Sequence, residues 1–276
     1  MPMISVLIPA SNEAALIGGC LTALCASDWP GSRVEVIVIA NGCTDDTTKL
    51  ARGFAPRFAA RDWSLVVLDR AEGGKLAALN AGDAAATAPI RAYLDADVTV
   101  SPPLLHDLYR LLDTDAPRYA SGQVRITARG RAARAYARIY RQVPFMRHGV
   151  PGCGLFAVNA AGRARWGTFP QIISDDTFVR LHFAPGERVS AAASYDWPLV
   201  EGWENLVKVR RRQDVGVDEI ATDYPALLAN DDKPAFPTSE KLSMALRDPV
   251  GFAVYSGVAL ASRLTRGRAS GWSRGR

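Results

Sequence analysis

Cysteine and histidine are scarce in this chain, and their scarcity excludes several kinds of site. The 276 residues include four cysteines and three histidines. No two cysteines form a C-x-x-C pair, so the sequence contains no zinc or redox motif and no disulfide framework. We expect the thiols to be reduced and buried. The histidines lie far apart in the chain, which favours a structural role for each.

Long apolar runs are missing as well. The N-terminal segment MPMISVLIPA lacks the basic leader and the long apolar stretch of a signal peptide. The longest late apolar run, residues 250–261, is too short to span a bilayer. We therefore expect a cytoplasmic protein.

Acidic residues are absent after Asp248, where five arginines follow. The formal net charge of +5 equals the charge of this last stretch, so the body of the protein is not predicted to bind nucleic acid. The basic tail beside a predicted apolar helix over 249–264 suggests peripheral contact with the inner face of a membrane. The alternative is a helix packed on the core with a solvated basic end. In the membrane interpretation, the apolar residues that contact the bilayer are Phe252, Val254, Tyr255, Val258 and Leu260.

Strand-like and helix-like patterns alternate over residues 1–100. A helix with Ser11 and Asn12 as candidate caps follows the first apolar run, and further helices are predicted over Thr47–Phe58 and Lys75–Thr87. Apolar strands joined by helices predict an α/β protein with a mostly parallel central sheet flanked by helices. The four predicted strands are Ile4–Pro9, Val34–Ala40, Leu65–Leu68 and Ile90–Leu94.

The alternation fades after residue 102, and the last part of the chain is predicted to be helical. We expect strands over 118–127 and 152–158 in this half. The predicted helices cover 130–143, 174–183, 203–229 and 249–264, with a loop over 229–238.

The segments that follow the predicted strands are polar and rich in glycine, and ligands of parallel sheets bind at these carboxyl ends. Asp95 and Asp97 follow the fourth strand, and residues two apart in a strand point to the same side. Two carboxylates facing one spot suit Mg²⁺ or Mn²⁺, with water and substrate phosphates as the other ligands. The alternative is a pair of solvated turn aspartates.

Three further segments carry candidate chemistry. Asn41–Thr47 ends the second strand, where it would contact a base or simply cap the next helix. Lys75 follows two glycines at a helix start and suits a phosphate, although a solvated lysine is equally consistent with the pattern. Asp175 and Asp176 open a helix capped by Ser174, where they either favour the helix dipole or supply a general base.

Taken in order, these motifs resemble those of the inverting glycosyltransferase family 2, whose fold is the Rossmann-like GT-A fold. Val6–Glu13 is similar to the opening strand and nucleotide loop, Asn41–Thr47 to a D-G-S-x-D motif, and Gly74–Gly82 to a G-K-x-x-A-L-N-x-G stretch. Asp95-Ala96-Asp97 matches the D-x-D signature. Gly152-Cys153-Gly154 resembles the acceptor-side strand, and Ser174-Asp175-Asp176 the E-D pair.

The resemblance implies a metal-dependent transfer of one sugar from a nucleoside-diphosphate sugar to a glycan or a lipid-linked acceptor hydroxyl. UDP is the first candidate nucleotide, followed by GDP and dTDP, and the implied cofactor is Mg²⁺ or Mn²⁺. Asp176, with Asp175, would be catalytic; Asp97 and Asp95 would hold the metal; and Gly152, Cys153 and Gly154 would face the acceptor. The implied nucleotide contacts are Pro9, Ala10, Asn12, Glu13, Asn41, Asp45, Lys75, Asn80, Asp95 and Ala96.

The same resemblance predicts a division of the chain. Residues 1–200 would form the catalytic domain, with a nucleotide half up to about residue 100 and an acceptor half after it. Residues 201–276 would form a helical C-terminal extension with the basic tail.

The chain departs from the family pattern at three points. Asn41 and Asp175 stand where the family more often has Asp and Glu, and no Q-x-x-R-W motif follows. We therefore expect one sugar per visit rather than processive synthesis.

Two rival interpretations remain, a nucleotidyltransferase and a non-catalytic protein that binds a nucleotide sugar. A dehydrogenase or methyltransferase would need a G-x-G turn after the first strand, and the sequence has none there.

Overall fold

The computed structural model describes residues 3–30 and 34–266. The chain divides into two compact units. Unit 1 consists of Met1–Arg125, Gly152–Gln171 and His182–Trp197, and unit 2 consists of Ile126–Pro151, Ile172–Leu181 and Pro198–Arg276. Three arginines of the predicted basic tail, Arg268, Arg274 and Arg276, lie outside the described residues.

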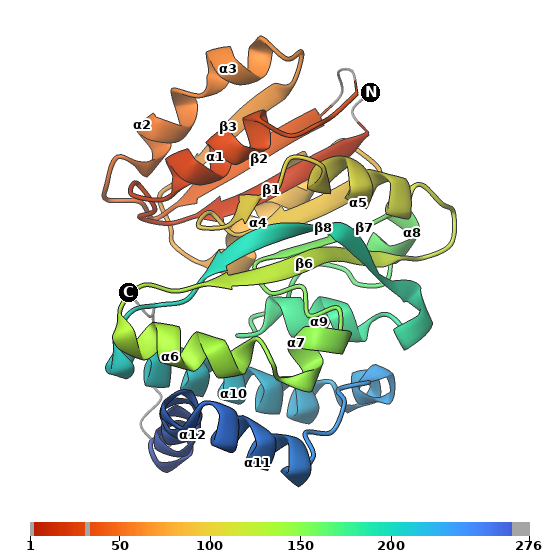
Figure 1. Cartoon of the computed structure of the whole chain (residues 1–276). Coiled ribbons are helices and arrows are strands. Elements are labelled where there is room, and N and C mark those ends of the chain that lie inside the picture. The colour runs from red at the N-terminus through yellow and green to blue at the C-terminus, as the bar shows by residue number, and fades with distance from the viewer. Residues whose placement is uncertain (1–2, 31–33, 267–276) are drawn as a thin grey trace. The chain divides into compact units, whose positions relative to one another are not determined.

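A sheet of eight strands in the order β3-β2-β1-β4-β7-β6-β8-β5 organises unit 1 (Figure 1). The parallel part of the sheet is the one predicted from the first four apolar runs, because β1 pairs in parallel with both β2 and β4, and β2 with β3. Beyond β4 the pairing turns antiparallel, at β4–β7, β7–β6 and β8–β5. The strands are β1 (Ile4–Ala10), β2 (Val34–Asn41), β3 (Ser64–Arg70), β4 (Ile90–Leu94), β5 (Thr99–Val100), β6 (Tyr119–Thr127), β7 (Leu155–Val158) and β8 (Arg188–Pro198).

The central strands are buried on both faces, which explains their continuous apolar sequences. Val6 and Ile8 of β1 belong to the main core cluster, whereas Leu7 points to the other face toward α4 (Lys75–Ala85). A Cβ on Gly82 of α4 would lie 2.9 Å from side-chain atoms of both Leu7 and Ile39. The glycine therefore lets this helix pack directly against the sheet, since any larger residue would push it away.

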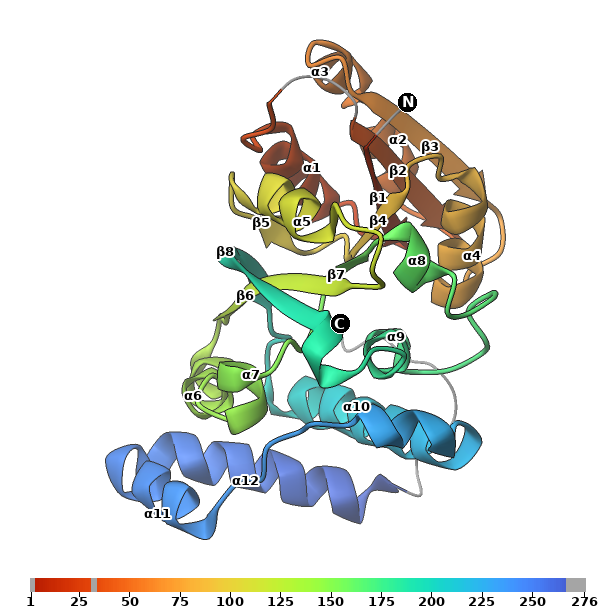
Figure 2. The same ribbon diagram turned by 90° about the vertical axis from the view of Figure 1, so that its right-hand side faces the viewer.

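Helices cover both faces of the sheet in unit 1 (Figure 2). Apolar residues of α1 and α5 pack into the main core on one face, and α4 contacts β1 and β2 on the other. The helices of this unit are α1 (Ile17–Cys25), α2 (Thr47–Arg52), α3 (Ala55–Ala59), α4, α5 (Leu104–Leu112), α8 (Ala160–Arg163) and the short 3-10 helix η1 (Pro185–Glu187).

The helix predicted over Thr47–Phe58 is wrong as a single element. The structure divides it into α2 and α3, with Gly53 ending the first helix and Pro56 in the first turn of the second. Proline lacks the N–H that an uninterrupted helix would need at that position, so the chain restarts there. Within unit 1, the sequence did not predict α5, α8, η1, β5 or β8.

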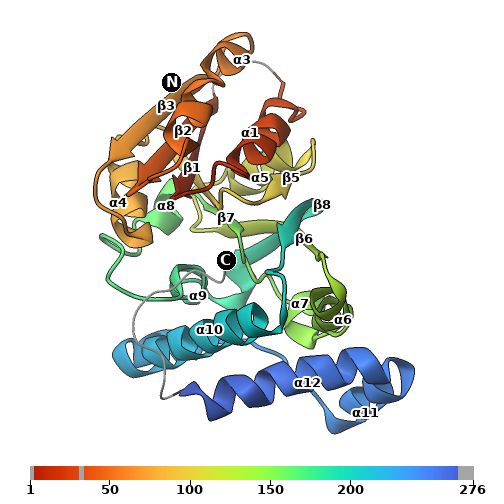
Figure 3. The ribbon, with the colours of Figure 1, turned by 90° about the vertical axis from the view of Figure 1, so that its left-hand side faces the viewer.

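Unit 2 is helical, and its core lies between α6, α10 and α12 (Figure 3). The buried cluster consists of Tyr136 from α6, Leu206 from α10 and Val258 from α12. Asp248 caps α12 by accepting a hydrogen bond from the Gly251 backbone N–H at 2.8 Å. The helices of this unit are α6 (Arg131–Tyr140), α7 (Pro144–His148), α9 (Asp175–Leu181), α10 (Trp203–Asp223), η2 (Pro225–Asn230), α11 (Thr238–Arg247) and α12 (Pro249–Leu264).

The compact units do not follow the order of the chain. Residues 126–151 and 172–181 belong with the C-terminal helices rather than with the sheet. The observed units are therefore discontinuous, whereas the sequence predicts one boundary near residue 200. The hydrophobic face of α6 explains the first of these insertions, because its buried side chains need α10 and α12 as partners. The functional division of the chain into donor and acceptor halves stays a prediction.

None of the helices within residues 3–30 and 34–266 combines the length and the apolar character that crossing a membrane requires.

Candidate active site

Four segments at the carboxyl ends of the parallel strands form the candidate site in unit 1, and Asn41 joins three of them. Its amide nitrogen donates hydrogen bonds to the carbonyl oxygens of Ala10 at 2.9 Å and Ile39 at 3.2 Å. Its amide oxygen accepts one from the backbone N–H of Gly74 at 3.0 Å. The side chain is 3% exposed. Asn41 therefore positions the loops, and both ends of its buried amide already make hydrogen bonds within the protein.

Asn12 makes the second connection between loops. The sequence predicts that it caps the first helix, and this prediction is wrong. Helix α1 begins at Ile17, and neither Ser11 nor Asn12 caps it. Asn12 instead adopts a left-handed φ of 52°, and its side-chain oxygen accepts hydrogen bonds from Thr44 and Asp45. The Thr44 backbone N–H is the closest donor, at 2.7 Å. A short polar side chain tolerates this backbone conformation, which explains an asparagine here.

Asp45 and Thr47 complete the contact between the β1 and β2 loops. The Asp45 carboxylate accepts hydrogen bonds from the Ala14 N–H at 3.1 Å, the Thr47 N–H at 3.0 Å and the Thr47 hydroxyl at 2.5 Å. The Thr47 oxygen accepts one from the Glu13 N–H at 2.7 Å. Desolvation opposes ionisation of Asp45, but these hydrogen bonds outweigh it and hold the pKa of its carboxyl below the ordinary value.

Two glycines allow the β2 and β3 loops to touch. Gly42 has a φ of 58°, and a Cβ placed on it would lie 2.8 Å from the Gly73 nitrogen. Both the backbone conformation and the close approach therefore require glycine at this position of the predicted N-G-C-T-D motif.

Asp95 and Asp97 lie directly after β4, and their surroundings carry a positive charge. The Lys75 ammonium at the start of α4 lies 3.1 Å from Asp95 Oδ1. Both aspartates are half-buried, whereas Ala96 between them is buried. Cys20 lies beneath this turn; burial, with a smaller effect of the Asp97 and Asp95 carboxylates, raises the pKa of its thiol, so it stays protonated.

The turn of Asp95 is fixed by the glycine-rich strand that was assigned to the acceptor. The Asp95 N–H donates a hydrogen bond to the Gly154 carbonyl oxygen at 2.9 Å. Gly154 has a φ of 76°, and a Cβ there would come within 2.8 Å of both Trp197 and Val98. The Cys153 carbonyl accepts a hydrogen bond from the Tyr195 hydroxyl at 2.8 Å. Gly152–Gly154 thus supports the aspartate turn through its backbone.

Gly152→Ala is expected to destabilise the protein. Gly152 has a φ of 67°, and its new Cβ would lie 1.7 Å from the hydroxyl oxygen of Tyr119, a fully buried ring. Strain and overpacking together should cost about 2–4 kcal/mol. Thermal unfolding should show a loss of several degrees. Gly167→Ala is the matched control, because no atom lies within 4 Å of its Cβ. Equal melting temperatures for the two variants would contradict the prediction.

The donor set around Asp95 and Asp97 fits a hard divalent cation. No cluster of three or more His, Cys, Asp or Glu side chains suited to a metal occurs within residues 3–30 and 34–266. A carboxylate pair with the remaining positions left to water and phosphate is the arrangement that Mg²⁺ prefers. The Lys75 ammonium beside Asp95 shows that the spot already accommodates a positive charge.

Asn80 lies within α4 and binds the backbone of another segment of unit 1. Its side chain pairs with the backbone of Phe169 in both directions, donating to the carbonyl at 3.1 Å and accepting from the N–H at 2.7 Å. It therefore anchors the segment after α8 to α4.

Asp175 and Asp176 differ in their access to solvent within unit 2. Both lie in the first turn of α9, but Asp175 is 6% exposed, whereas Asp176 is half-buried. Asp176 Oδ1 accepts a hydrogen bond from the Thr177 N–H at 2.7 Å. Of the two residues, Asp176 is the more exposed to solvent.

Residues of α10 that the sequence did not single out fix the start of α9. The Glu219 carboxylate accepts a hydrogen bond from the Ile173 N–H at 2.7 Å. A Cβ on Gly216 would lie 2.3 Å from the Ser174 hydroxyl, so the two segments touch at this glycine. No sequence motif marks either residue; a glycine within a long helical pattern is the single signal for the close contact.

A cluster of charged residues surrounds the other end of α9. The Arg180 side chain is 2% exposed and binds Asp231 and Asp232, each at 2.7 Å. Lys233 follows in the same loop, with its ammonium 5.6 Å from the centre of the Phe145 ring. Desolvation lowers the pKa of Lys233, while the carboxylates of Asp231 and Asp176 oppose the shift. Lys233 lies in a loop to which the sequence assigned no role.

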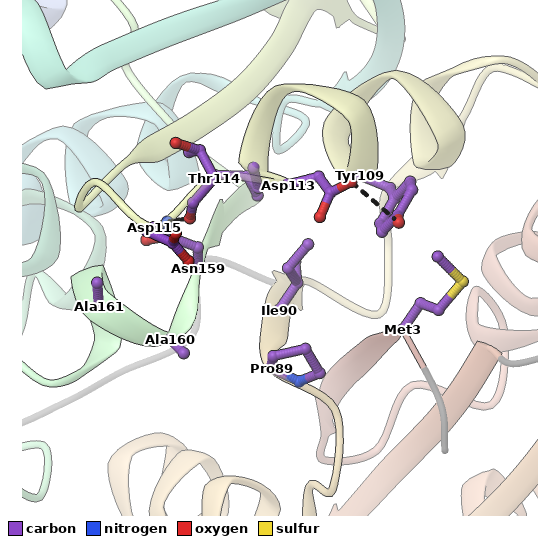
Figure 4. A pocket seen from close by; sticks show the side chains of 11 residues that line it. Met3, Pro89, Ile90, Tyr109, Asp113, Thr114, Asp115, Asn159, Ala160 and Ala161 are labelled. Carbon is purple, nitrogen blue, oxygen red and sulfur yellow. Dashed lines mark hydrogen bonds between the residues drawn. The ribbon is translucent and has the colours of Figure 1, made fainter.

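A surface pocket of about 710 Å³ lies away from these segments, at the amino ends of the strands (Figure 4). Met3, which precedes β1, and Ile90, which begins β4, line it together with Tyr109 and Asp113. Because parallel strands place their ligands at the carboxyl ends, this pocket is not part of the candidate site.

Comparison with known proteins identifies one matching family. The model of glycosyl transferase family 2 matches residues 5–162 of the chain. The match covers the sheet of unit 1 from β1 to β7 and includes the Asn41, Lys75 and Asp95 segments.

Among curated relatives, glycosyltransferase AglE of Haloferax volcanii is 37% identical over 97 residues, which are 35% of this chain and 31% of that protein. The β-monoglucosyldiacylglycerol synthase of Synechocystis is 29% identical over 199 residues, or 66% of this chain and 40% of that protein. The chain thus spans well under two thirds of the length of these relatives.

Solved structures that share the fold of this chain include the following two. The mannosyltransferase PcManGT of Pyrobaculum calidifontis, in complex with GDP-Man and Mn²⁺, superposes with a TM-score of 0.65 at 19% identity, covering 96% of this chain and 87% of that one. Staphylococcus aureus TarS 1-349 with UDP-GlcNAc superposes with a TM-score of 0.53 at 16% identity, covering 94% and 81%.

Proposed function

The chain belongs to glycosyl transferase family 2, and from this premise we propose that it transfers a single sugar from a nucleoside-diphosphate sugar to an acceptor hydroxyl, with inversion at the anomeric carbon. The acceptor is a glycan or a lipid-linked molecule. UDP is the first candidate nucleotide, and GDP is the second because PcManGT, a protein of the same fold, binds GDP-Man. The observation that carries the proposal is the pair of aspartates beside Lys75 at the carboxyl ends of the parallel strands.

The donor nucleotide is proposed to lie across the joined β1, β2 and β3 loops. Pro9, Glu13 and Asp45 flank the base, while Asn41 and Asn12 hold the loops in register through the hydrogen bonds described above. A rigid, preformed loop set reduces the entropy that binding must overcome.

Asp97 and Asp95 are proposed to hold Mg²⁺ or Mn²⁺ against the diphosphate, with Asp97 as the more direct ligand. The bound ion would stabilise the negative charge of the departing nucleoside diphosphate. Lys75, at a helix start, is proposed to exchange its contact with Asp95 for one with a phosphate oxygen of the donor.

Asp176 is proposed to be the general base that takes the proton from the acceptor hydroxyl as the oxygen attacks the anomeric carbon. Its partial exposure supports this role, and the burial of Asp175 favours a supporting one for that residue. Glu219 and Gly216 position the turn that carries Asp176.

The test is thermal unfolding with UDP, GDP, dTDP, CDP and ADP, each with Mn²⁺ and with a chelator. A nucleotide at about 100 times its Kd should add roughly 2.7 kcal/mol of stability, which amounts to several degrees. We expect a shift with one nucleotide that disappears with the chelator, and donor turnover with that nucleotide's sugars when an acceptor is present.

The outcomes separate the rival functions. A metal-dependent shift without sugar transfer to any acceptor would favour a non-catalytic nucleotide-sugar-binding protein. Release of diphosphate from a nucleoside triphosphate would favour a nucleotidyltransferase. A folded sample that shows no metal-dependent shift with any nucleotide would remove the main support for the proposed donor site.

A further inference from the structure

The outer faces of α11 and α12 in unit 2 expose an unusual amount of apolar surface. Leu242 and Leu246 lie four residues apart on α11 and therefore on one side of it. On α12, Val250, Leu260 and Leu264 share a second stripe with the exposed Ala253. The exposed fractions are 60% for Leu242, 77% for Leu246, 64% for Val250, 58% for Leu260 and 77% for Leu264. We call these five side chains the apolar face.

This face differs from the one expected from the sequence. Of the residues assigned there to a membrane, Val258 is fully buried, and Val254 and Tyr255 pack against the cluster of Tyr136 and Leu206. Those residues form the inner face of α12, which packs on α6 and α10. The opposite side of the helix therefore faces outward. Only Leu260 of the original set belongs to the apolar face.

Exposed basic side chains lie on the same two helices as the apolar face. Lys241, Arg247 and Arg263 are exposed on the same two helices. The acidic side chains of α11 and α12 are limited to Glu240. The sequence after the described part of α12 continues with Arg268, Arg274 and Arg276 and without an acidic residue. Apolar side chains between cations are complementary to a bilayer whose surface is negatively charged.

We propose that the apolar face docks unit 2 on an anionic membrane, with Leu242, Leu246, Val250, Leu260 and Leu264 in the interface and Lys241, Arg247 and Arg263 on lipid phosphates. Contact is peripheral, in agreement with the absence of a helix able to cross a membrane among the described residues. The proposal concerns where the protein works and does not rest on the donor chemistry.

Flotation with vesicles of phosphatidylcholine, and of phosphatidylcholine mixed with phosphatidylglycerol, tests the proposal on the full chain without nucleotide. We expect the protein to float with the anionic vesicles only, and less at high salt, because salt screens the charges. Leu242→Ser with Leu246→Ser should reduce partitioning roughly tenfold or more, given the area that two leucines bury. Arg247→Gln with Arg263→Gln should also reduce partitioning by about tenfold or more, since each basic residue near an anionic surface contributes favourable binding free energy.

Leu50→Ser is the matched control, because Leu50 is also an exposed leucine, at 41%, but lies on α2 in unit 1. Its flotation should equal that of the unaltered chain. Failure of the unaltered chain to float, or equal flotation of the double leucine variant, would overturn the proposal. A fall in molar mass by light scattering in that variant would assign the face to contact between two copies instead. The nucleotide-induced shift of each variant reports separately on the donor site.

Discussion

Asp176→Asn should lose sugar transfer by roughly 10²- to 10⁴-fold in kcat, the usual contribution of a general base. Asparagine keeps the size of the side chain and can still accept the hydrogen bond from the Thr177 N–H. It cannot take a proton from an acceptor hydroxyl. Product formation measured with saturating donor and acceptor checks the prediction, and the nucleotide-induced thermal shift should remain.

Asp218→Asn is a suitable control for Asp176→Asn. Asp218 is an exposed aspartate of α10 that pairs with Arg266 on the surface. Such a pair contributes little to stability, so its loss should leave transfer unchanged. Full activity of Asp176→Asn would show that another residue is the base, whereas loss of the nucleotide shift in that variant would point to a structural defect.

Asp97→Asn should abolish the metal-dependent part of nucleotide binding. An amide oxygen carries no charge, and Asp97 is proposed to be the more direct ligand of the ion. Because the ion would supply several kcal/mol of stabilisation to the departing diphosphate, transfer should fall by about two to four powers of ten. Thermal unfolding with the selected nucleotide, with and without Mn²⁺, checks the binding part, and product formation checks the rate.

The corresponding control is Asp113→Asn. Asp113 is exposed in the pocket at the amino ends of the strands, so its charge is remote from the proposed donor. Its variant should keep the full Mn²⁺-dependent shift. If Asp97→Asn behaved like Asp113→Asn, the two aspartates after β4 would not be the metal site.

Patterns within a short stretch of sequence predicted much of unit 1. The four apolar runs became the parallel strands β1 to β4, because apolar β-rich segments joined by helices pack into a parallel sheet that helices cover. The Asp95-Ala96-Asp97 segment was predicted at a strand end, and it lies directly after β4. The order of the first four strands was therefore readable from the periodicity, whereas the division into α2 and α3 and the short strand β5 were not.

The roles of individual polar side chains were less readable. Nothing in the local sequence distinguishes an asparagine such as Asn41, whose amide makes three hydrogen bonds within the loops, from one that contacts a base. The same holds for Asn12, which joins two loops and does not cap α1. Hydrogen-bond partners more than 30 residues apart depend on which loops meet in the fold. Local sequence propensity does not predict which loops meet.

The amino-acid sequence by itself determined the α/β character, the family and the residue types available for metal and phosphate at the strand ends. The tertiary structure decided which side chains are exposed. On α9, Asp176 is more exposed than Asp175, and on α12 the outer face is exposed while the inner face is covered. It also assigned α6 and α9 to the unit of the C-terminal helices. The physical reason is that burial is a property of packing between distant segments. A helix pattern shows which side is apolar, but only its partners determine which apolar side chains remain uncovered.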